Sequence, residues 1–310
     1  MEPTILLAIA MQVLSSFLFA SGAIMQSLGV KSQFDPNAVA SSNRLTIKGL
    51  LKLFTVPKWV IGLLLVFTGA AIHLAALTFA PVSVVQPVGI LAVPWSVILA
   101  SKIHKHTITA KLWRAVGITV LGVVGFTVFS SLFATGEKYV SFSAMLWSFL
   151  VVCLICVVLS FFATRAVAWA KAILWSSVGA IFYGLASGFM KASMNLIQKH
   201  DHSFGSWQFI ATVVMMLLCY GLGAWMIQQG YASGPAEITV GTMTTVDPFV
   251  AVVFGLVVLG EGMGMGVGPM IGMVVTGAIA VYGVAMLSKD HPDAIEERRR
   301  AEAAIANADA

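Results

Sequence analysis

An aspartate lies inside an apolar segment that is long enough to cross a lipid bilayer. Residues 234–259 read GPAEITVGTMTTVDPFVAVVFGLVVL, with Asp247 and Pro248 about halfway along and Thr244 among the threonines before them. An aspartate at the centre of a membrane helix is disfavoured by roughly 2.5–3.5 kcal/mol, so an intramembrane carboxylate is a functional-site hypothesis by default. We predict that Asp247 and Thr244 line a substrate cavity near the middle of the membrane, where transporters bind substrates. The alternative is a structural aspartate, capped by hydroxyls or amides or held protonated.

Four further polar side chains fall within apolar segments. Lys191, Gln86 and Gln12 are candidate substrate contacts, and His73 joins Asp247 as a candidate for proton coupling, because imidazole exchanges protons near neutral pH. Each has an ordinary alternative. Lys191 could extend its ammonium group to the outer membrane surface. The amides and the imidazole could simply bond between helices, where such bonds contribute about 0.6–2 kcal/mol each.

The composition identifies the class of protein that positions these groups. Of the 310 residues, 59% are apolar and only 10% are charged, and the mean hydropathy is +0.93. A soluble domain of this size would not tolerate such a surface. We therefore predict an all-α polytopic membrane protein with nine transmembrane helices, since about 20 apolar residues span the hydrocarbon core. The predicted spans are 5–30, 59–79, 82–101, 113–133, 142–163, 172–197, 207–231, 236–259 and 267–287.

The basic residues indicate an orientation in the membrane. The net charge of +5 could suggest a nucleic-acid partner, but 15 of the 18 Lys and Arg residues fall in alternate loops and in the tail. By the positive-inside rule that side is cytoplasmic. We therefore expect no nucleic-acid partner, an amino terminus outside and a carboxyl terminus inside the cell membrane.

An internal repeat relates the two parts of the chain. At an offset of 154 residues, Pro81 aligns with Pro235 and Pro94 with Pro248, and Gly69 aligns with Gly223. Spans one to four therefore repeat as spans six to nine, and span five reverses the orientation of the second copy. Such an inverted repeat is typical of secondary transporters. We predict two inverted four-helix repeats, 1–140 and 172–288, joined by a linking helix in 141–171 and followed by a cytoplasmic tail, 289–310.

Prolines inside spans weaken the preceding helical turn and leave carbonyls for neighbours, water or a ligand. Pro87, Pro94 and Pro248 are accordingly predicted hinges. At this depth, flexible positions in matched places of two inverted halves would serve an exchange between inward-open and outward-open states.

Two blocks of the chain resemble a known family. FAPVSVVQPVGILAVPWSVILAS at 79–101 and VFGLVVLGEG at 253–262 resemble the drug/metabolite transporter (EamA-like) superfamily. The AP-x-x-x-V-x-P-x-G arrangement around Pro81, Val85, Pro87 and Gly89 is most similar to the NIPA-type magnesium transporter branch. The resemblance implies a transporter with nine spans. An acidic residue common after the first block in relatives is absent here, where 102–106 read KIHKH.

We predict a secondary transporter that moves a small polar or amphipathic metabolite by alternating access. The resemblance implies a second possibility, Mg²⁺ transport, although Mg²⁺ prefers octahedral oxygen coordination with one or two carboxylates and water. A third is a membrane scaffold that has lost transport. No enzyme constellation and no cofactor motif are present, so neither an enzyme nor a cofactor is expected, and no metal ligands are assigned. The expected partners are the substrate, the lipid bilayer and a second copy in a homodimer.

Overall fold

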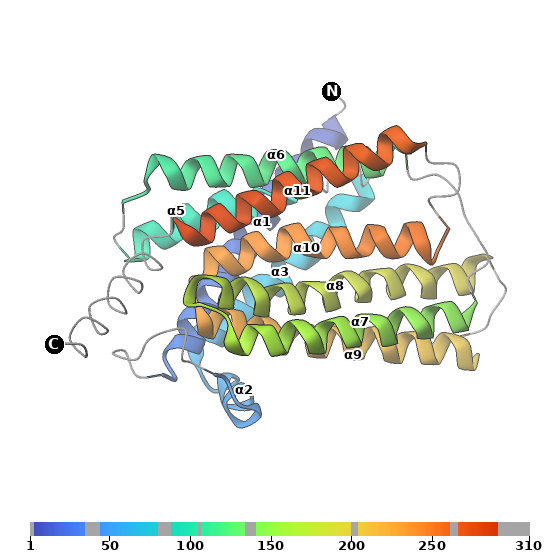
Figure 1. Cartoon of the computed structure of the whole chain (residues 1–310), viewed down its shortest axis with the longest axis horizontal. Helices are drawn as coiled ribbons and strands as arrows, with labels where there is room; N and C mark the ends of the chain where they lie inside the picture. Colours follow the sequence, from blue (N-terminus) through green and yellow to red (C-terminus); the bar gives the residue numbers. More distant parts are fainter. Residues whose placement is uncertain are drawn as a thin grey trace.

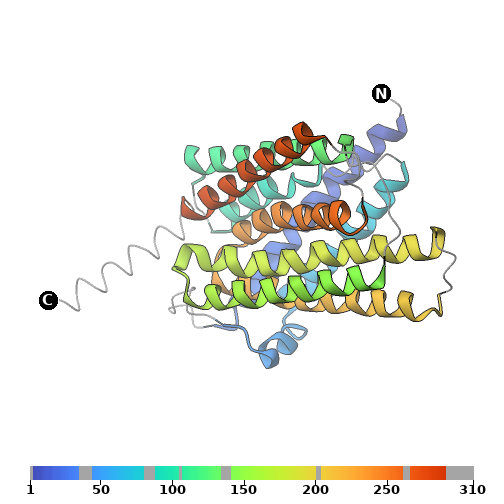
Figure 2. The same cartoon turned by 45° about the vertical axis from the view of Figure 1, so that its right-hand side comes forward.

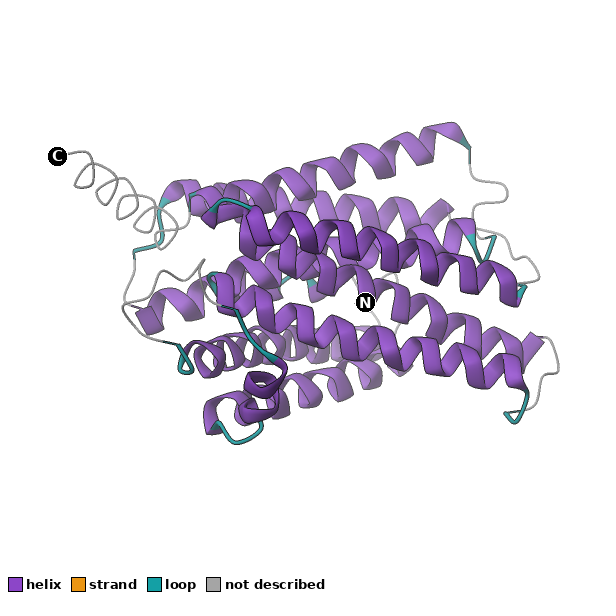
Figure 3. Ribbon diagram, turned by 60° about the horizontal axis from the view of Figure 1, so that its bottom comes forward, coloured by secondary structure: helices purple, strands orange, loops and turns teal. Residues whose placement is uncertain are grey.

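The computed structural model describes residues 3–34, 44–79, 88–104, 107–133, 141–199, 204–260 and 266–290. All regular secondary structure in these ranges is helical (Figure 3). This confirms the predicted all-helical class.

Ten helices make up the described part of the chain (Figure 1). They are α1 (Pro3–Lys31), α2 (Ile47–Leu53), α3 (Pro57–Phe79), α5 (Ala92–His104), α6 (Ala110–Phe133), α7 (Phe142–Arg165), α8 (Ala168–Lys199), α9 (Trp207–Ser233), α10 (Ala236–Val257) and α11 (Val267–Lys289). Side chains just before the first turn cap the beginnings of two of these helices. The hydroxyl of Thr46 accepts from the amide of Gly49 before α2, and Ser141 accepts from Ala144 before α7, so each satisfies an amide that the first turn leaves unpaired.

The described residues do not confirm the predicted count of nine membrane-length helices. Within the described ranges, seven helices are long and apolar enough to span a bilayer, and an eighth results if α2 and α3, bent by 76°, form one span. Pro57 begins α3 at this bend, a position that proline favours because the first helical amide has no partner. The chain is therefore a multi-pass membrane protein, as predicted.

The predicted third span is not one continuous helix. A turn at Ile90 and Leu91 precedes α5, which has only 13 residues, and residues 80–87 of this segment lie outside the described ranges. Hydropathy misses such a break, because the residues on both sides of the turn are apolar. Backbone at a break like this is tolerated in membranes where protein or a water-filled cavity surrounds it.

Successive long helices run in opposite directions, so their ends gather at two ends of the bundle (Figures 1 and 2). One end, where α2 lies, carries most of the basic residues, and we call it the basic end. Within the described ranges, its basic residues are Lys31, Arg44, Lys48, Lys52, Lys58, Lys102, Lys111, Arg114, Arg165, Lys171 and Lys289.

Glycines bring three helix pairs into backbone contact. On α1 and α3, a Cβ added at Gly22 or at Gly62 would lie 2.7 Å from the carbonyl oxygen of the other residue. Gly179 of α8 and Gly223 of α9 face each other in the same reciprocal way, at 2.9 and 3.0 Å. Gly122 of α6 lies against the backbone of Ala280 in α11. Small residues allow this close approach, which provides much of the attraction between helices in lipid.

Burial is concentrated near the basic end of the second half of the chain. Residues 227–242, which form the end of α9, the turn at Gly234 and Pro235, and the beginning of α10, are all buried. We call them the α9–α10 hairpin. It lies on α8, where Gly230 packs against Ser176 and the Ser176 hydroxyl bonds to Oγ1 of Thr239 at 3.0 Å.

Candidate functional site

Asp247 lies at the middle of α10, eleven residues after Ala236 and ten before Val257. At about 1.5 Å per residue, this puts it roughly 16 Å from either end of the helix. The side chain is half-buried, and Pro248 follows it inside the helix. Among the described residues, no donor hydrogen-bonds to the Asp247 carboxylate.

Two tyrosines lie beside this carboxylate. Asp247 is close enough to Tyr183 of α8 and Tyr220 of α9 to interact electrostatically with both. The two rings are 5.9 Å apart between centroids, and the hydroxyl of Ser187 on α8 donates to the Tyr183 carbonyl at 3.1 Å. These residues come from three helices, so the sequence did not reveal them. Tyr183 and Ser187 are four residues apart on one helix face, a weak signal when each is taken alone.

Glycines of α8 allow α10 to pack closely against α8 at the level of Asp247. A Cβ at Gly184 would lie 2.5 Å from the Asp247 carbonyl oxygen, and one at Gly188 would lie 2.7 Å from Cγ of Phe254. The helices run in the same direction, so this register places Lys191 level with Val257. Lys191 therefore lies about ten residues, or roughly 15 Å, beyond Asp247 along the helices. Its side chain is exposed, and the register does not favour a direct pair between the two.

Thr244 and the predicted hinges have more local surroundings. The Thr244 hydroxyl donates to the carbonyl oxygens of Val240 at 2.9 Å and Gly241 at 3.2 Å, inside its own helix. Such back-bonding is common for threonine in helices. Pro94 lies in the first turn of α5, where the missing amide costs no helical bond, whereas Pro248 lies in the interior of α10. Pro87 lies outside the described residues.

A second polar pair joins α1 and α3. Nδ1 of His73 donates to Oε1 of Gln12 at 2.7 Å, and Gln12 is only 2% exposed. A Cβ at Gly89, just before the turn that precedes α5, would lie 3.0 Å from Nε2 of Gln12. The structure thus brings two predicted site residues together next to a break in the chain. Gln86, the third predicted amide or imidazole of this region, lies outside the described ranges.

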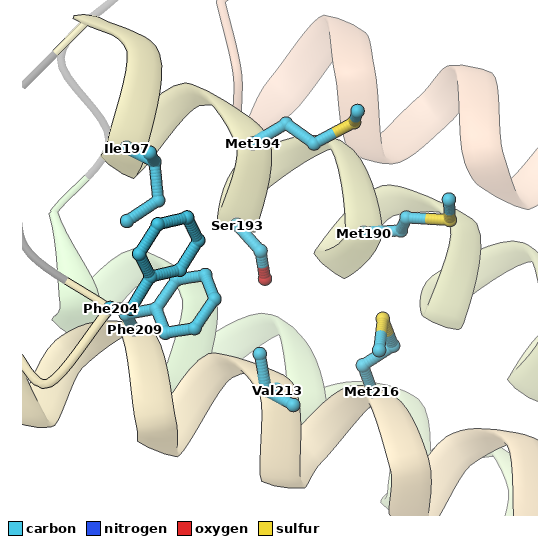
Figure 4. Close-up of a pocket in the computed structure, with 8 residues that line it drawn as sticks. All are labelled: Met190, Ser193, Met194, Ile197, Phe204, Phe209, Val213 and Met216. Carbon is cyan, nitrogen blue, oxygen red and sulfur yellow. The ribbon is translucent and has the colours of Figure 1, made fainter.

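A pocket of about 360 Å³ lies between α8 and α9 toward the end opposite the basic end (Figure 4). Its lining residues are Met190, Ser193, Met194, Ile197, Phe204, Phe209, Val213 and Met216. The hydroxyl of Ser193 donates to the Phe189 carbonyl at 2.8 Å, so the pocket is apolar. Met190 and Met216 lie about one helical turn from Ser187 and Tyr220, respectively. The pocket therefore adjoins the residues around Asp247.

The described residues contain no group of three or more His, Cys, Asp or Glu side chains that could hold a metal ion. A single carboxylate suits a cation that retains much of its water, as Mg²⁺ usually does in proteins.

Comparison with known proteins gives one relevant similarity. No family model matches the chain, and no solved structure matches it. The chain is 29% identical over 219 residues to a protein of Arabidopsis thaliana named "Probable magnesium transporter NIPA9". The alignment covers 66% of this chain and spans 61% of the length of that relative. With its membrane-length helices, the chain is a multi-pass membrane protein that is similar over two-thirds of its length to a probable transporter.

Proposed function

We propose that this protein is a membrane transporter for a small cation, with hydrated Mg²⁺ as the first candidate. The observation that carries the proposal is the half-buried Asp247 carboxylate at the centre of a bilayer-length helix, with no donor bonded to it among the described residues. A charged side chain at the centre of a membrane helix is energetically costly, so such residues usually have a functional role. The similarity to a probable magnesium transporter supports the choice of ion.

The chemistry around Asp247 suits a hydrated ion. Mg²⁺ dehydrates reluctantly and is usually bound through one or two carboxylates and several waters. Asp247 supplies one carboxylate, and the hydroxyls of Tyr183, Tyr220 and Ser187 are groups that can accept hydrogen bonds from the water shell. Binding through water is weaker than direct coordination, and a transported ion must leave the site again.

We extend the proposal to alternating access by two inverted halves. The halves are α1–α6 and α8–α11, with α7 between them, and their corresponding helices run in opposite directions. The packing registers support the relation. Gly69 of α3 lies against Ser15 of α1. The repeat offset of 154 maps Gly69 to Gly223. In the first span the offset is 166, because Ser21-Gly22 aligns with Ser187-Gly188, and this maps Ser15 to Ile181. Gly223 indeed contacts Gly179 and Tyr183, which flank position 181.

The orientation that we propose follows the basic end. Its concentration of Lys and Arg favours the cytoplasmic side of the cell membrane. The amino terminus, at the beginning of α1, would then lie outside. The homodimer expected from the sequence remains a prediction.

A second candidate substrate is a small organic cation or zwitterion, in keeping with the metabolite transport predicted from the sequence. The specific observation in its favour is the pair of aromatic rings, Tyr183 and Tyr220, beside Asp247. Aromatic faces attract ammonium groups by about 0.5–2 kcal/mol, and the adjoining pocket is apolar.

Uptake into proteoliposomes tests the proposal. The purified protein is reconstituted with an Mg²⁺-sensitive dye inside the vesicles, and a panel of organic cations and zwitterions is assayed in parallel by radiolabel. We expect Mg²⁺ uptake that Asp247→Asn lowers at least about ten-fold, because the amide keeps the size of the side chain but removes the negative charge that attracts the hydrated ion. Asp290→Asn, the same change just after α11, is the matched control and should transport normally.

Each outcome has a separate meaning. Uptake of an organic solute but not of Mg²⁺ would select the second candidate. Normal Mg²⁺ uptake by Asp247→Asn would contradict the role of the carboxylate. If the intact protein moved neither class of solute, the transporter proposal would fail in favour of the scaffold.

A further inference from the structure

Two adjacent glutamines near the end of α9 bond to the first half of the chain. Nε2 of Gln228 donates to Oε1 of Gln26 at 3.0 Å, and Nε1 of Trp59 donates to Oε1 of Gln228 at 2.9 Å. Gln229 pairs with the backbone of Leu45, receiving its amide at 3.0 Å and donating to its carbonyl at 2.6 Å. The glutamine side chains are 4% and 7% exposed. Four buried hydrogen bonds thus join the halves across the basic end.

One face of α8 shows how burial changes along the bundle. Residues 176, 180, 183, 187, 190 and 194 are three or four positions apart and share this face. Ser176 and Ala180, near the basic end, are 0% exposed, whereas Met190 and Met194 are 42% and 52% exposed. Tyr183, beside Asp247, is half-buried and Ser187 is exposed. The face that carries the candidate site is therefore covered toward the basic end and uncovered toward the other.

The cover at the basic end is the α9–α10 hairpin. It rests on α8 through the contact of Gly230 with Ser176, and Gln228 and Gln229 bond its α9 side to α1, α3 and the segment before α2. Glutamine is well suited to hold such a cover in a membrane. Its amide both donates and accepts, and single neutral hydrogen bonds between membrane helices are weak enough to break reversibly.

We propose that Gln228 and Gln229 form a glutamine latch that closes the basic end of the transport path, so that the described structure is open toward the opposite end. The inference rests on the proposed transport function. Opening to the basic side requires the α9–α10 hairpin to separate from α1 and α3, which breaks all four bonds. The latch thereby determines how often Asp247 is reached from the basic side.

Thiol accessibility tests the latch without any substrate. Cys153, Cys156 and Cys219 are first replaced by alanine, and Ser187→Cys then serves as the reporter next to the candidate site. A charged, membrane-impermeant methanethiosulfonate reagent is applied to vesicles of each orientation. In the otherwise unchanged protein, we expect labelling from the side opposite the basic end and little from the basic side.

In Gln228→Met with Gln229→Met, labelling from the basic side should rise at least about ten-fold. Methionine keeps the length of the side chain but removes the four bonds, and each buried bond is equivalent to a factor of about two to ten. Trp59→Phe, which removes one donor and keeps most of the ring, should give about a three-fold rise. If the double variant does not fold, Trp59→Phe alone tests the latch.

The matched control is Gln33→Met. Gln33 lies at the same end but donates to the Gly49 carbonyl at 3.2 Å, within the first half, so its loss should not change the labelling ratio. Equal labelling in Gln33→Met, Trp59→Phe and the double glutamine variant would overturn the latch. The latch would also be overturned if the double glutamine variant were labelled faster from the side opposite the basic end. Because no solute is transported in this assay, failure of Mg²⁺ uptake and failure of the latch are separate results.

Discussion

The contact between α6 and α11 leads to a sharp prediction about stability. A Cβ added at Gly122 would lie 2.7 Å from Cα and 2.8 Å from Cβ of Ala280, whereas carbon atoms in contact prefer about 3.5–4.0 Å. In Gly122→Ala the two helices must move apart by about 1 Å. Overpacking of this kind destabilises by about 1–3 kcal/mol. The loss should be at the upper end, because Ala280 meets the new methyl group with its backbone.

Gly117 of the same helix provides the matched control, since nothing lies within 4 Å of a Cβ added there. Gly117→Ala should be neutral or stabilising by up to about 1 kcal/mol, because alanine favours helix. In detergent, thermal unfolding followed by a thiol-reactive dye should therefore separate the two variants by about 5–10 °C. A Gly122→Ala protein that unfolds at or above the temperature of Gly117→Ala would refute the close packing of α6 on α11.

Two further predictions use the same measurements. Gly223→Ala should lower both transport and stability, because the new Cβ would lie 2.6 Å from Cδ1 of Tyr183 and would displace that ring from Asp247. Gly221→Ala is the control: open space surrounds a Cβ at this position, so transport and stability should not change. His73→Phe should destabilise the protein by about 1–3 kcal/mol, because it leaves the buried Gln12 side-chain carbonyl without its donor. Adding Gln12→Met should restore part of this loss. Equal melting temperatures for the unchanged protein, the single variant and the double variant would contradict the hydrogen bond between His73 and Gln12.

The sequence was sufficient to predict the helical membrane class, because runs of about 20 apolar residues have few other stable solutions. It also located Asp247 near the middle of its helix. It did not predict the turn at Ile90 and Leu91, since hydropathy averages over a window and does not register a local break. The broken third span is the consequence.

Contacts between distant helices were beyond the reach of the sequence pattern. No sequence pattern distinguishes Tyr183 and Tyr220, because their place near Asp247 depends on the glycine contacts of α8 with α9 and α10. Gln228 and Gln229 lay at the end of a predicted span with no assigned role. Their partners are 169 to 202 positions away in the chain, so only the folded structure relates them.

The latch also bears on the symmetry of the proposed transport cycle. At the repeat offset of 154, Gln228 and Gln229 correspond to Leu74 and Ala75, which have no amide side chain. In the alternative state, the corresponding segment of the first half would close the end opposite the basic end. That closure would lack these side-chain hydrogen bonds. Two inverted halves with identical chemistry would favour neither state, and a difference of about 1.4 kcal/mol already shifts the populations ten-fold. If the proposed latch closes the basic end, we expect that closed state to be the more populated one. Asp247 corresponds to Val93 in the first half, so the charge of the proposed path would come from the second half alone.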